Sequence, residues 1–215
     1  MKTILDCAGG TGYPSIELKQ LGWDITYSDG SSAMLDIFTE KLEASKLDMP
    51  KYFSRWEDLS QKVPNTYDAL MCAGNSFIGI NSYESDFAIA DEVVKTNMLS
   101  AVSEFYNKLN TGGVLYIDLC KADRAAPEKP YSESITDDNA HIFRTISYDS
   151  VTNIRTNLTT TTLLSDGSAT DTITKVVPLF AEELINLLLE VGFSRVERST
   201  VADADYVDSF FAFKD

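Results

Sequence analysis

The chain is poor in histidine and in cysteine. Its 215 residues include one histidine, His141, and three cysteines, Cys7, Cys72 and Cys120, which lie far apart. None of them has the spacing of metal ligands, so we expect no metal site. Each cysteine stands in or beside an apolar run, which is typical of free core thiols in a reducing compartment. These features predict a cytoplasmic protein without disulfides.

The sequence also lacks a long apolar run and an excess of positive charge. No stretch approaches the roughly 20 apolar residues of a membrane span. Met1 leads directly into a strand pattern, so we expect no signal peptide. The 18 Lys and Arg residues stand against 33 Asp and Glu residues, which gives a formal net charge of −15. A field of that sign repels phosphate backbones. We therefore expect neither a membrane nor a nucleic acid as a partner, and a small molecule remains.

What the sequence does contain is an alternation of strand and helix patterns. Strands are predicted over residues 2–7, 23–28, 52–53, 67–73 and 114–119, with helices over 13–21, 31–45 and 91–109. This order is typical of a parallel sheet with helices on both faces.

The second half of the chain has a different pattern. Residues 141–177 are dense in Thr, Ile and Val around one turn at 165–167, a helix is predicted over 181–191, and strands over 193–199 and 207–213 close the chain. We therefore expect one α/β domain over residues 1–215. It should hold a Rossmann-like, mostly parallel sheet with an antiparallel last strand, and residues 121–179 should form a loop and a small antiparallel β insertion.

Three glycines, Gly9, Gly10 and Gly12, follow the first predicted strand almost at once. Glycines let a backbone approach a ligand closely, and the N-terminus of the following helix offers N–H donors. Asp29 ends the next strand, where an acidic residue can accept from ribose hydroxyls. The pattern fits NAD as well as S-adenosylmethionine, although Ser15 occupies the third glycine position of the dinucleotide motif. A tight turn without a ligand is the remaining interpretation.

Four stretches together resemble class I S-adenosylmethionine-dependent methyltransferases. They are ILDCAGGTG at residues 4–12, DITYSD at 24–29 with SAML at 32–35, YDALMCAGNSF at 67–77, and NTGGVLYID at 110–118. The third stretch resembles the glycine N-methyltransferase branch in particular. The similarity extends over nearly the whole chain, including the antiparallel insertion before the last helix.

The resemblance implies a role for individual residues. The glycine turn would pass under the methionine half of S-adenosylmethionine, Asp29 would hold the ribose, and Met34 and Trp56 would lie against the adenine. The implied cofactor-binding residues are Asp6, Ala8, Gly9, Gly10, Gly12, Asp29, Gly30, Met34, Arg55, Trp56 and Ala73, and the implied acceptor-binding residues are Asn75, Ser76 and Phe77. Two other interpretations stay open: Trp56 as a core or loop anchor, and Asn75 as a left-handed turn residue.

The sequence departs from the family at two places. The family usually has a helical segment before its first strand, whereas this first strand begins at Lys2. The cover over the cofactor is therefore expected from residues 121–140, from the stretch after Gly74, or from an oligomer or partner chain. The glycine N-methyltransferase branch also has an arginine, two residues after the fifth-strand aspartate, that binds the acceptor carboxylate. Cys120 stands there, followed by Lys121, so glycine is not the expected acceptor.

The implied activity is in-line methyl transfer to the nitrogen or oxygen of a small molecule. Such a displacement depends on positioning and on a site poor in water. No side chain is assigned as a catalytic base, and His141 is expected to be an ordinary strand residue. Two alternatives remain: an NAD-linked oxidoreductase of similar fold, and a non-catalytic S-adenosylmethionine-binding subunit that lacks its own lid.

Overall fold

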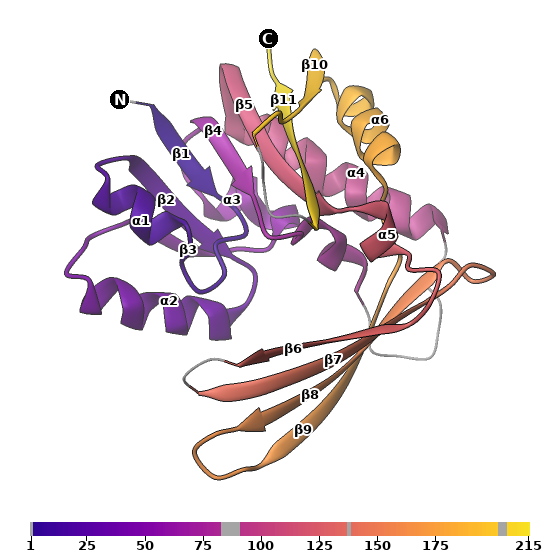
Figure 1. The fold of residues 1–215 in the computed structure, drawn as a ribbon. Coiled ribbons are helices and arrows are strands. Elements are labelled where there is room, and N and C mark those ends of the chain that lie inside the picture. The colour runs from indigo at the N-terminus through magenta and orange to yellow at the C-terminus, as the bar shows by residue number, and fades with distance from the viewer. Residues whose placement is uncertain (1, 83–90, 137–138, 202–205) are drawn as a thin grey trace.

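The computed structural model describes residues 2–82, 91–136, 139–201 and 206–215, and they form two sheets (Figure 1). The strands of the larger sheet, in spatial order, are β10 (Arg195–Arg198), β11 (Val207–Phe213), β5 (Leu109–Cys120), β4 (Tyr67–Cys72), β1 (Thr3–Asp6), β2 (Asp24–Asp29) and β3 (Lys51–Phe53). The smaller sheet consists of β6 (Tyr131–Thr136), β7 (Ala140–Asp149), β8 (Ile154–Leu163) and β9 (Ala169–Val176).

Helices connect these strands. They are α1 (Ser15–Gln20), α2 (Ser32–Ala44), α3 (Leu59–Lys62), α4 (Asp91–Lys108), α5 (Ala122–Ala125) and α6 (Ala181–Val191), with 3-10 turns η1 (Trp56–Asp58) and η2 (Phe77–Asn81). Within the described part of the chain, none of these helices is both long and apolar enough to cross a membrane.

The larger sheet confirms the predicted fold class. The strands from β5 through β4, β1 and β2 to β3 pair in parallel, whereas β11 pairs antiparallel with both β5 and β10. The chain begins in the middle of the sheet, runs outward to β3, and then returns to β4 on the other side of β1. The order therefore reverses between β1 and β4, and ligands of open α/β sheets bind beyond the carboxyl ends of the strands at such a point.

Alternate residues of the central strands supply two separate cores. Leu5 and Leu70 belong to the apolar cluster that α4 and α6 cover, while Ile4 and Ile25 belong to the cluster beneath α1 and α2. Successive side chains of a strand point to opposite faces. The sheet is therefore buried on both faces, as a parallel sheet requires.

The smaller sheet corrects the prediction for residues 121–140. We expected a long loop there, but the structure places α5 and the strand β6 in this range, and β6 pairs antiparallel with β7. The strand Tyr131–Thr136 is mostly exposed and polar, so its sequence lacks the apolar pattern by which a strand is recognised. A second turn between β7 and β8 was missed as well. Asn153 adopts a φ of 53° there, a left-handed conformation that asparagine tolerates.

Two element boundaries also differ from the prediction. Helix α1 begins at Ser15 rather than at residue 13, and Pro14 stands in the turn before it. Strand β5 begins at Leu109 rather than at the predicted residue 114, so it includes residues 110–113, which the prediction left between the helix and the strand. The pairing of β4 with β5 shifts its register in this region, and Gly112 has a φ of 78°. A bulge inside a strand and a turn before it have the same glycine signal.

The glycine turn after β1 packs tightly against its own protein. A Cβ atom on Gly9 would lie 2.2 Å from the Tyr27 ring, and one on Gly12 would lie 2.8 Å from both Ile16 and Phe38. The Tyr27 ring in turn stacks on Phe38, with 3.8 Å between ring centroids. These two glycines are therefore required by packing beneath the turn, whatever binds above it.

Gly9→Ala should consequently destabilise the fold. The added methyl group must displace the buried Tyr27 ring, and overpacking of this kind costs about 1–3 kcal/mol. Gly79→Ala is the matched control, because a Cβ atom there meets nothing within 4 Å. Urea unfolding of both variants measures the effect, and equal free energies of unfolding would contradict the packing role of Gly9.

Candidate functional site

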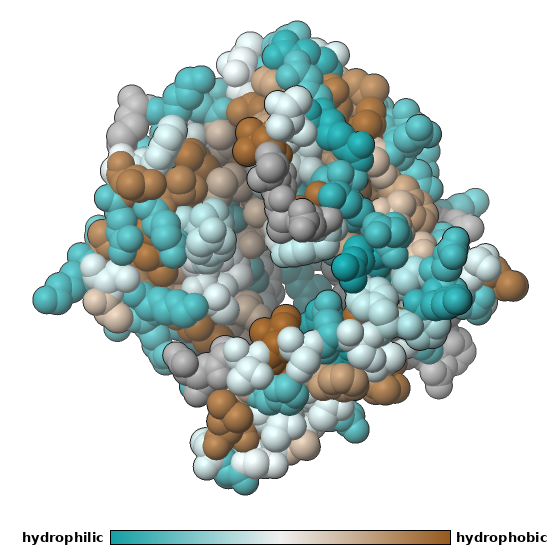
Figure 2. All heavy atoms as spheres, in the orientation of Figure 1, coloured by the Kyte–Doolittle hydropathy of each residue, from teal (hydrophilic) through white to brown (hydrophobic). Residues whose placement is uncertain are grey.

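A pocket of about 840 Å³ lies beyond the carboxyl ends of β1, β2 and β3. The predicted residues that line it are Ala8, Asp29, Gly30, Arg55, Trp56 and Ser76, and α4 contributes Asn97, Ser100 and Ala101. In Figure 1 these strand ends face the smaller sheet, and both chain termini lie at the opposite edge. Figure 2 shows a hollow in the surface between the larger sheet with its helices and the smaller sheet. The pocket is thus at the reversal point of the strand order.

Asp29 joins the two turns that border the pocket. Its Oδ2 atom accepts a hydrogen bond from the Gly10 amide at 2.8 Å, and its Oδ1 atom accepts one from the Ser31 amide at 2.8 Å. A carboxylate has about four lone-pair sites. Each oxygen can therefore accept a further hydrogen bond, and the side chain lines the pocket.

Of the turn after β1, Cys7 and Ala8 line the pocket, whereas the predicted Gly9, Gly10 and Gly12 do not. Gly10 has a φ of 51°, and a Cβ atom on it would meet nothing within 4 Å. Its carbonyl accepts a hydrogen bond from the Tyr27 hydroxyl at 2.6 Å. Gly10 is thus the one glycine of the turn whose missing side chain leaves open space, and its left-handed backbone favours glycine.

Asp6 lies underneath the turn and is only 1% exposed. Its carboxylate accepts hydrogen bonds from the Ser15 hydroxyl at 2.5 Å and from the Ala8 amide at 3.2 Å. Burial raises the pKa of Asp6 from 3.8 to about 6, although these two hydrogen bonds oppose the rise. The side chain therefore positions the turn from below, and Ser15 has its own structural use at the position of the third dinucleotide glycine.

Trp56 forms one wall of the pocket and also anchors it. Its Nε1 atom donates a hydrogen bond to the Cys7 carbonyl at 2.6 Å. Its ring contacts Phe77 and Phe105, each with 5.8 Å between ring centroids. The indole is half-buried, so both interpretations of Trp56 hold in part: it packs as an anchor and it presents a surface to the pocket.

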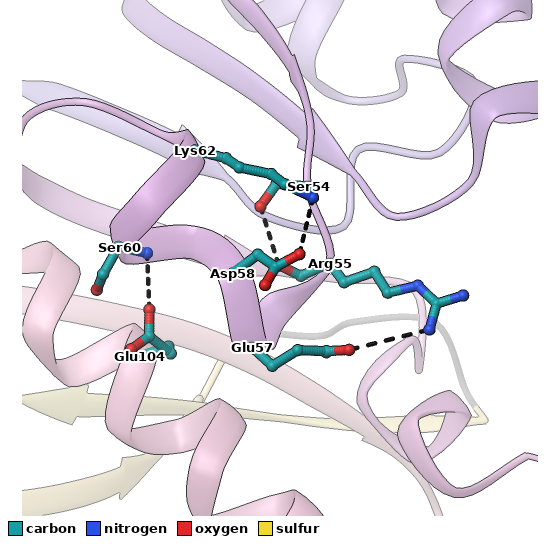
Figure 3. Close-up of polar contacts among 7 residues, drawn as sticks. All are labelled: Ser54, Arg55, Glu57, Asp58, Ser60, Lys62 and Glu104. Carbon is teal, nitrogen blue, oxygen red and sulfur yellow. Dashed lines mark hydrogen bonds and ion pairs between the residues drawn. The ribbon is translucent and has the colours of Figure 1, made fainter.

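Charged residues surround this wall. Figure 3 shows the side chains of Arg55 and Glu57 extended side by side away from η1. Their Nη1 and Oε1 atoms are 3.9 Å apart, and Lys62 pairs with Asp58 at 2.7 Å. The Ser60 amide donates to Glu104 of α4 at 2.7 Å. Arg55 is exposed, so its pair with Glu57 contributes little to stability and leaves the guanidinium free to turn toward a ligand.

The stretch after β4 is held by an aspartate that sequence reasoning did not select as a site residue. The buried Asp118 carboxylate accepts hydrogen bonds from the amides of Gly74 and Asn75. Asn75 adopts the left-handed conformation, with a φ of 56°, and its Oδ1 atom accepts from the Cys120 amide at 2.8 Å. The turn interpretation of Asn75 therefore describes its backbone, which Asp118 holds, while the Cys120 amide fixes the place of its side chain.

The remaining predicted residues lie around the pocket. Ser76 donates from its hydroxyl to the Ala73 carbonyl at 2.7 Å. The Phe77 ring is fully buried among the aromatic side chains, so only its backbone can face an acceptor. Met34, in the first turn of α2, is 39% exposed and does not line the pocket as it stands.

The histidine and the candidate metal ligands lie elsewhere. His141 stands on β7, where its ring contacts the hydroxyl groups of Ser134 and Thr136, which agrees with an ordinary strand histidine. No group of three or more His, Cys, Asp or Glu side chains in the described ranges could hold a metal ion.

The chain resembles known methyltransferases in sequence and in fold, although no family model matches it. A glycine/sarcosine N-methyltransferase from Aphanothece halophytica is 31% identical over 117 residues, which are 54% of this chain and 40% of that protein. The chain thus spans about two fifths of the length of this curated relative.

The fold similarity extends further along the chain. A S-adenosylmethionine-dependent methyltransferase from Clostridium acetobutylicum superposes with a TM-score of 0.76 at 15% identity, over 99% of this chain and 83% of that one. An amino pentose methyltransferase from Micromonospora echinaspora, solved with S-adenosylmethionine bound, gives a TM-score of 0.69 at 14% identity, over 100% and 84%. These matches confirm the resemblance read from the four motifs.

The buried Asp6 predicts a dependence of stability on pH. Because its pKa is raised in the folded chain, the folded state binds this proton more tightly than the unfolded state. Stability relative to a neutral residue should therefore fall as the pH rises from about 4 to about 6, by up to about 3 kcal/mol. Above about pH 7 the difference should be constant.

The difference in free energy of unfolding between Asp6→Asn and the wild type, measured by urea unfolding across this range, tests the prediction. The exposed Asp36 supplies the control Asp36→Asn, which should show no such change. A difference for Asp6→Asn that is independent of pH would contradict a raised pKa.

Proposed function

We propose that this chain, which has the fold and the motifs of class I S-adenosylmethionine-dependent methyltransferases of the glycine N-methyltransferase-like branch, methylates a nitrogen atom of a small molecule. The observation that carries the proposal is the pocket in which Ala8 of the turn after β1 meets Asp29, Trp56 and Ser76, with Asp29 bonded to the Gly10 amide of the same turn. The names of the similar proteins, N-methyltransferases and an amino pentose methyltransferase, support a nitrogen acceptor over an oxygen acceptor.

The pocket residues fit the parts of S-adenosylmethionine. The spare lone pairs of Asp29 suit the ribose hydroxyls, and the exposed surface of Trp56 with the flexible Arg55 suits the adenine. Gly10 and Ala8 would lie beneath the methionine half, where Gly10 leaves the space of a side chain open. Met34 would reach the adenine only through a change of side-chain rotamer, since α2 begins beside Ser31 at the pocket edge.

S-adenosylmethionine supplies an electrophilic methyl group on a sulfonium. The residues of the pocket then have to hold the acceptor nitrogen in line with the methyl–sulfur bond and to exclude water. Asn75, Ser76 and the backbone at Phe77 are the proposed acceptor side of the site. Asp118 and the Cys120 amide fix the turn at Asn75, and Ser76, which follows it, lines the pocket. A neutral amine attacks without a general base, which agrees with the lack of an assigned one.

The two alternatives have less support. An NAD-linked oxidoreductase would use a third glycine at Ser15, but the Ser15 hydroxyl is committed to Asp6. A non-catalytic subunit would lack an acceptor side, whereas the Asn75 turn is well fixed. The expected closure of the site by residues 121–140 stays a prediction, now for α5, β6 and the segments beside them rather than for a loop. The involvement of a partner chain also stays a prediction.

Asp29→Asn should weaken binding of S-adenosylhomocysteine about tenfold or more. The amide loses one charged acceptor, and a hydrogen bond to a charged group contributes about 1.5–3 kcal/mol. Asp24→Asn, at the exposed start of the same strand, is the control and should bind like the wild type. Calorimetry measures both affinities. Equal binding by the Asp29→Asn variant would place the ribose elsewhere.

Trp56 should report ligand binding by fluorescence. The chain has two tryptophans. Trp56 lines the pocket. Trp23 is 44% exposed and directly precedes β2, at the end of this strand that is opposite to Asp29. S-adenosylhomocysteine should change the emission of the wild type and of Trp23→Phe, and leave that of Trp56→Phe unchanged. A signal that follows Trp23 instead would contradict the assigned pocket.

A further inference from the structure

Arg155 is a buried cation without an anionic partner among the described residues. It stands on β8, is 8% exposed, and its Nη1 atom is the one buried side-chain polar atom, within the part of the chain that the structure describes, that has no hydrogen-bond partner. Its Nε atom donates to Asn157 at 3.1 Å, which is a neutral amide. Guanidinium groups keep their charge in proteins, and buried charges are normally paired.

The sheet register shows which way Arg155 faces. Its cross-strand partners are Tyr148 on β7 and Val176 on β9, and directly paired residues share one face of a sheet. Val176 is 3% exposed, and Ile146, on the same face, is fully buried. Arg155 therefore belongs to the face of the smaller sheet that packs against the rest of the chain.

Arg155 reaches the acceptor side of the candidate site at the end of β5. Its guanidinium lies close enough to the Cys120 side chain to act on the pKa of that thiol, and the Cys120 amide donates to Asn75. Asn75 precedes Ser76, which lines the pocket. The unpaired cation thus lies beside Cys120, and Cys120 is hydrogen-bonded to the turn that we assign to the acceptor.

Neither the Cys120 thiol nor the Asp118 carboxylate neutralises this cation. Burial raises the pKa of the Cys120 thiol above its ordinary value, although Arg155 acts in the opposite direction, so the thiol stays neutral at physiological pH. The Asp118 carboxylate is already occupied by the amides of Gly74 and Asn75 and by the Tyr116 hydroxyl. The charge of Arg155 is therefore left for a group that does not belong to these residues.

We propose that Arg155 binds a carboxylate of the methyl acceptor and so determines that the acceptor is an anionic small molecule. The assignment to the acceptor rests on the proposed function. A carboxylate could also come from the methionine half of the cofactor, but that half is assigned to the turn of Ala8 and Gly10 after β1. Arg155 approaches instead from the smaller sheet, behind Asn75 and Cys120.

The test compares carboxylates with their neutral amides. Acetate and sarcosine are titrated into the full chain at constant ionic strength, beside acetamide and sarcosinamide, with and without saturating S-adenosylhomocysteine. The readouts are the melting temperature and the guanidinium resonances of nitrogen-15-labelled arginine. Arg155→Met removes the charge at similar volume, Arg155→Lys restores it, and Arg144→Met removes a guanidinium of the same sheet that is already paired with Glu133 at 3.0 Å.

We expect the two carboxylates, and neither amide, to shift the Arg155 resonance and to raise the melting temperature saturably. Arg155→Met should bind the carboxylates at least about tenfold more weakly, Arg155→Lys should recover part of the loss, and Arg144→Met should behave like the wild type. Without a carboxylate, Arg155→Met should melt no lower than the wild type, because it buries no unpaired charge.

Three results would overturn the inference. Carboxylates that act no more strongly than amides, or equally on Arg155→Met, would show that Arg155 binds no anion. Weaker binding of S-adenosylhomocysteine by Arg155→Met would assign the cation to the cofactor carboxylate. A wild-type chain that binds carboxylates through Arg155 but no S-adenosylhomocysteine would refute the proposed function and, with it, the assignment to a methyl acceptor.

Discussion

The Asp29 carboxylate is the contact on which the pocket depends. By accepting from the amides of Gly10 and Ser31, it joins the turn after β1 to the turn that starts α2. The Tyr27 hydroxyl holds the same glycine turn from the other side, and the Tyr27 ring fills the space left by Gly9. One strand, β2, therefore shapes most of the neighbouring turn, and the open lone pairs of Asp29 face the pocket as a result.

A second carboxylate has the same role on the acceptor side. Asp118, near the end of β5, accepts from the amides of Gly74 and Asn75 as Asp29 does on β2. Between these two carboxylates, Trp56 stands at the start of η1. Its indole donates a hydrogen bond to the carbonyl of Cys7, which follows β1, and its ring contacts Phe105 of α4. The site is thus fixed from several strands at once, which is the pre-organisation that an in-line transfer needs.

The sequence predicted the features that depend on residues close together in the chain. It missed the features that depend on contacts between residues far apart in the chain. The parallel core, the glycine turn and Asp29 follow from apolar runs and spacing. Strand β6 was missed because an exposed polar strand has no apolar signal. The packing role of Gly9 could not be foreseen, since it depends on the position of the Tyr27 ring. Likewise, no sequence pattern brings Arg155 of the smaller sheet to Cys120 of the larger one.

Calorimetric titration of the wild-type chain with S-adenosylmethionine, S-adenosylhomocysteine and NAD tests the central claim most directly. The account predicts that both sulfur-containing nucleosides bind at the pocket of Asp29 and Trp56, and that NAD does not compete with them. Binding of NAD, together with no heat from S-adenosylmethionine or S-adenosylhomocysteine, would contradict it.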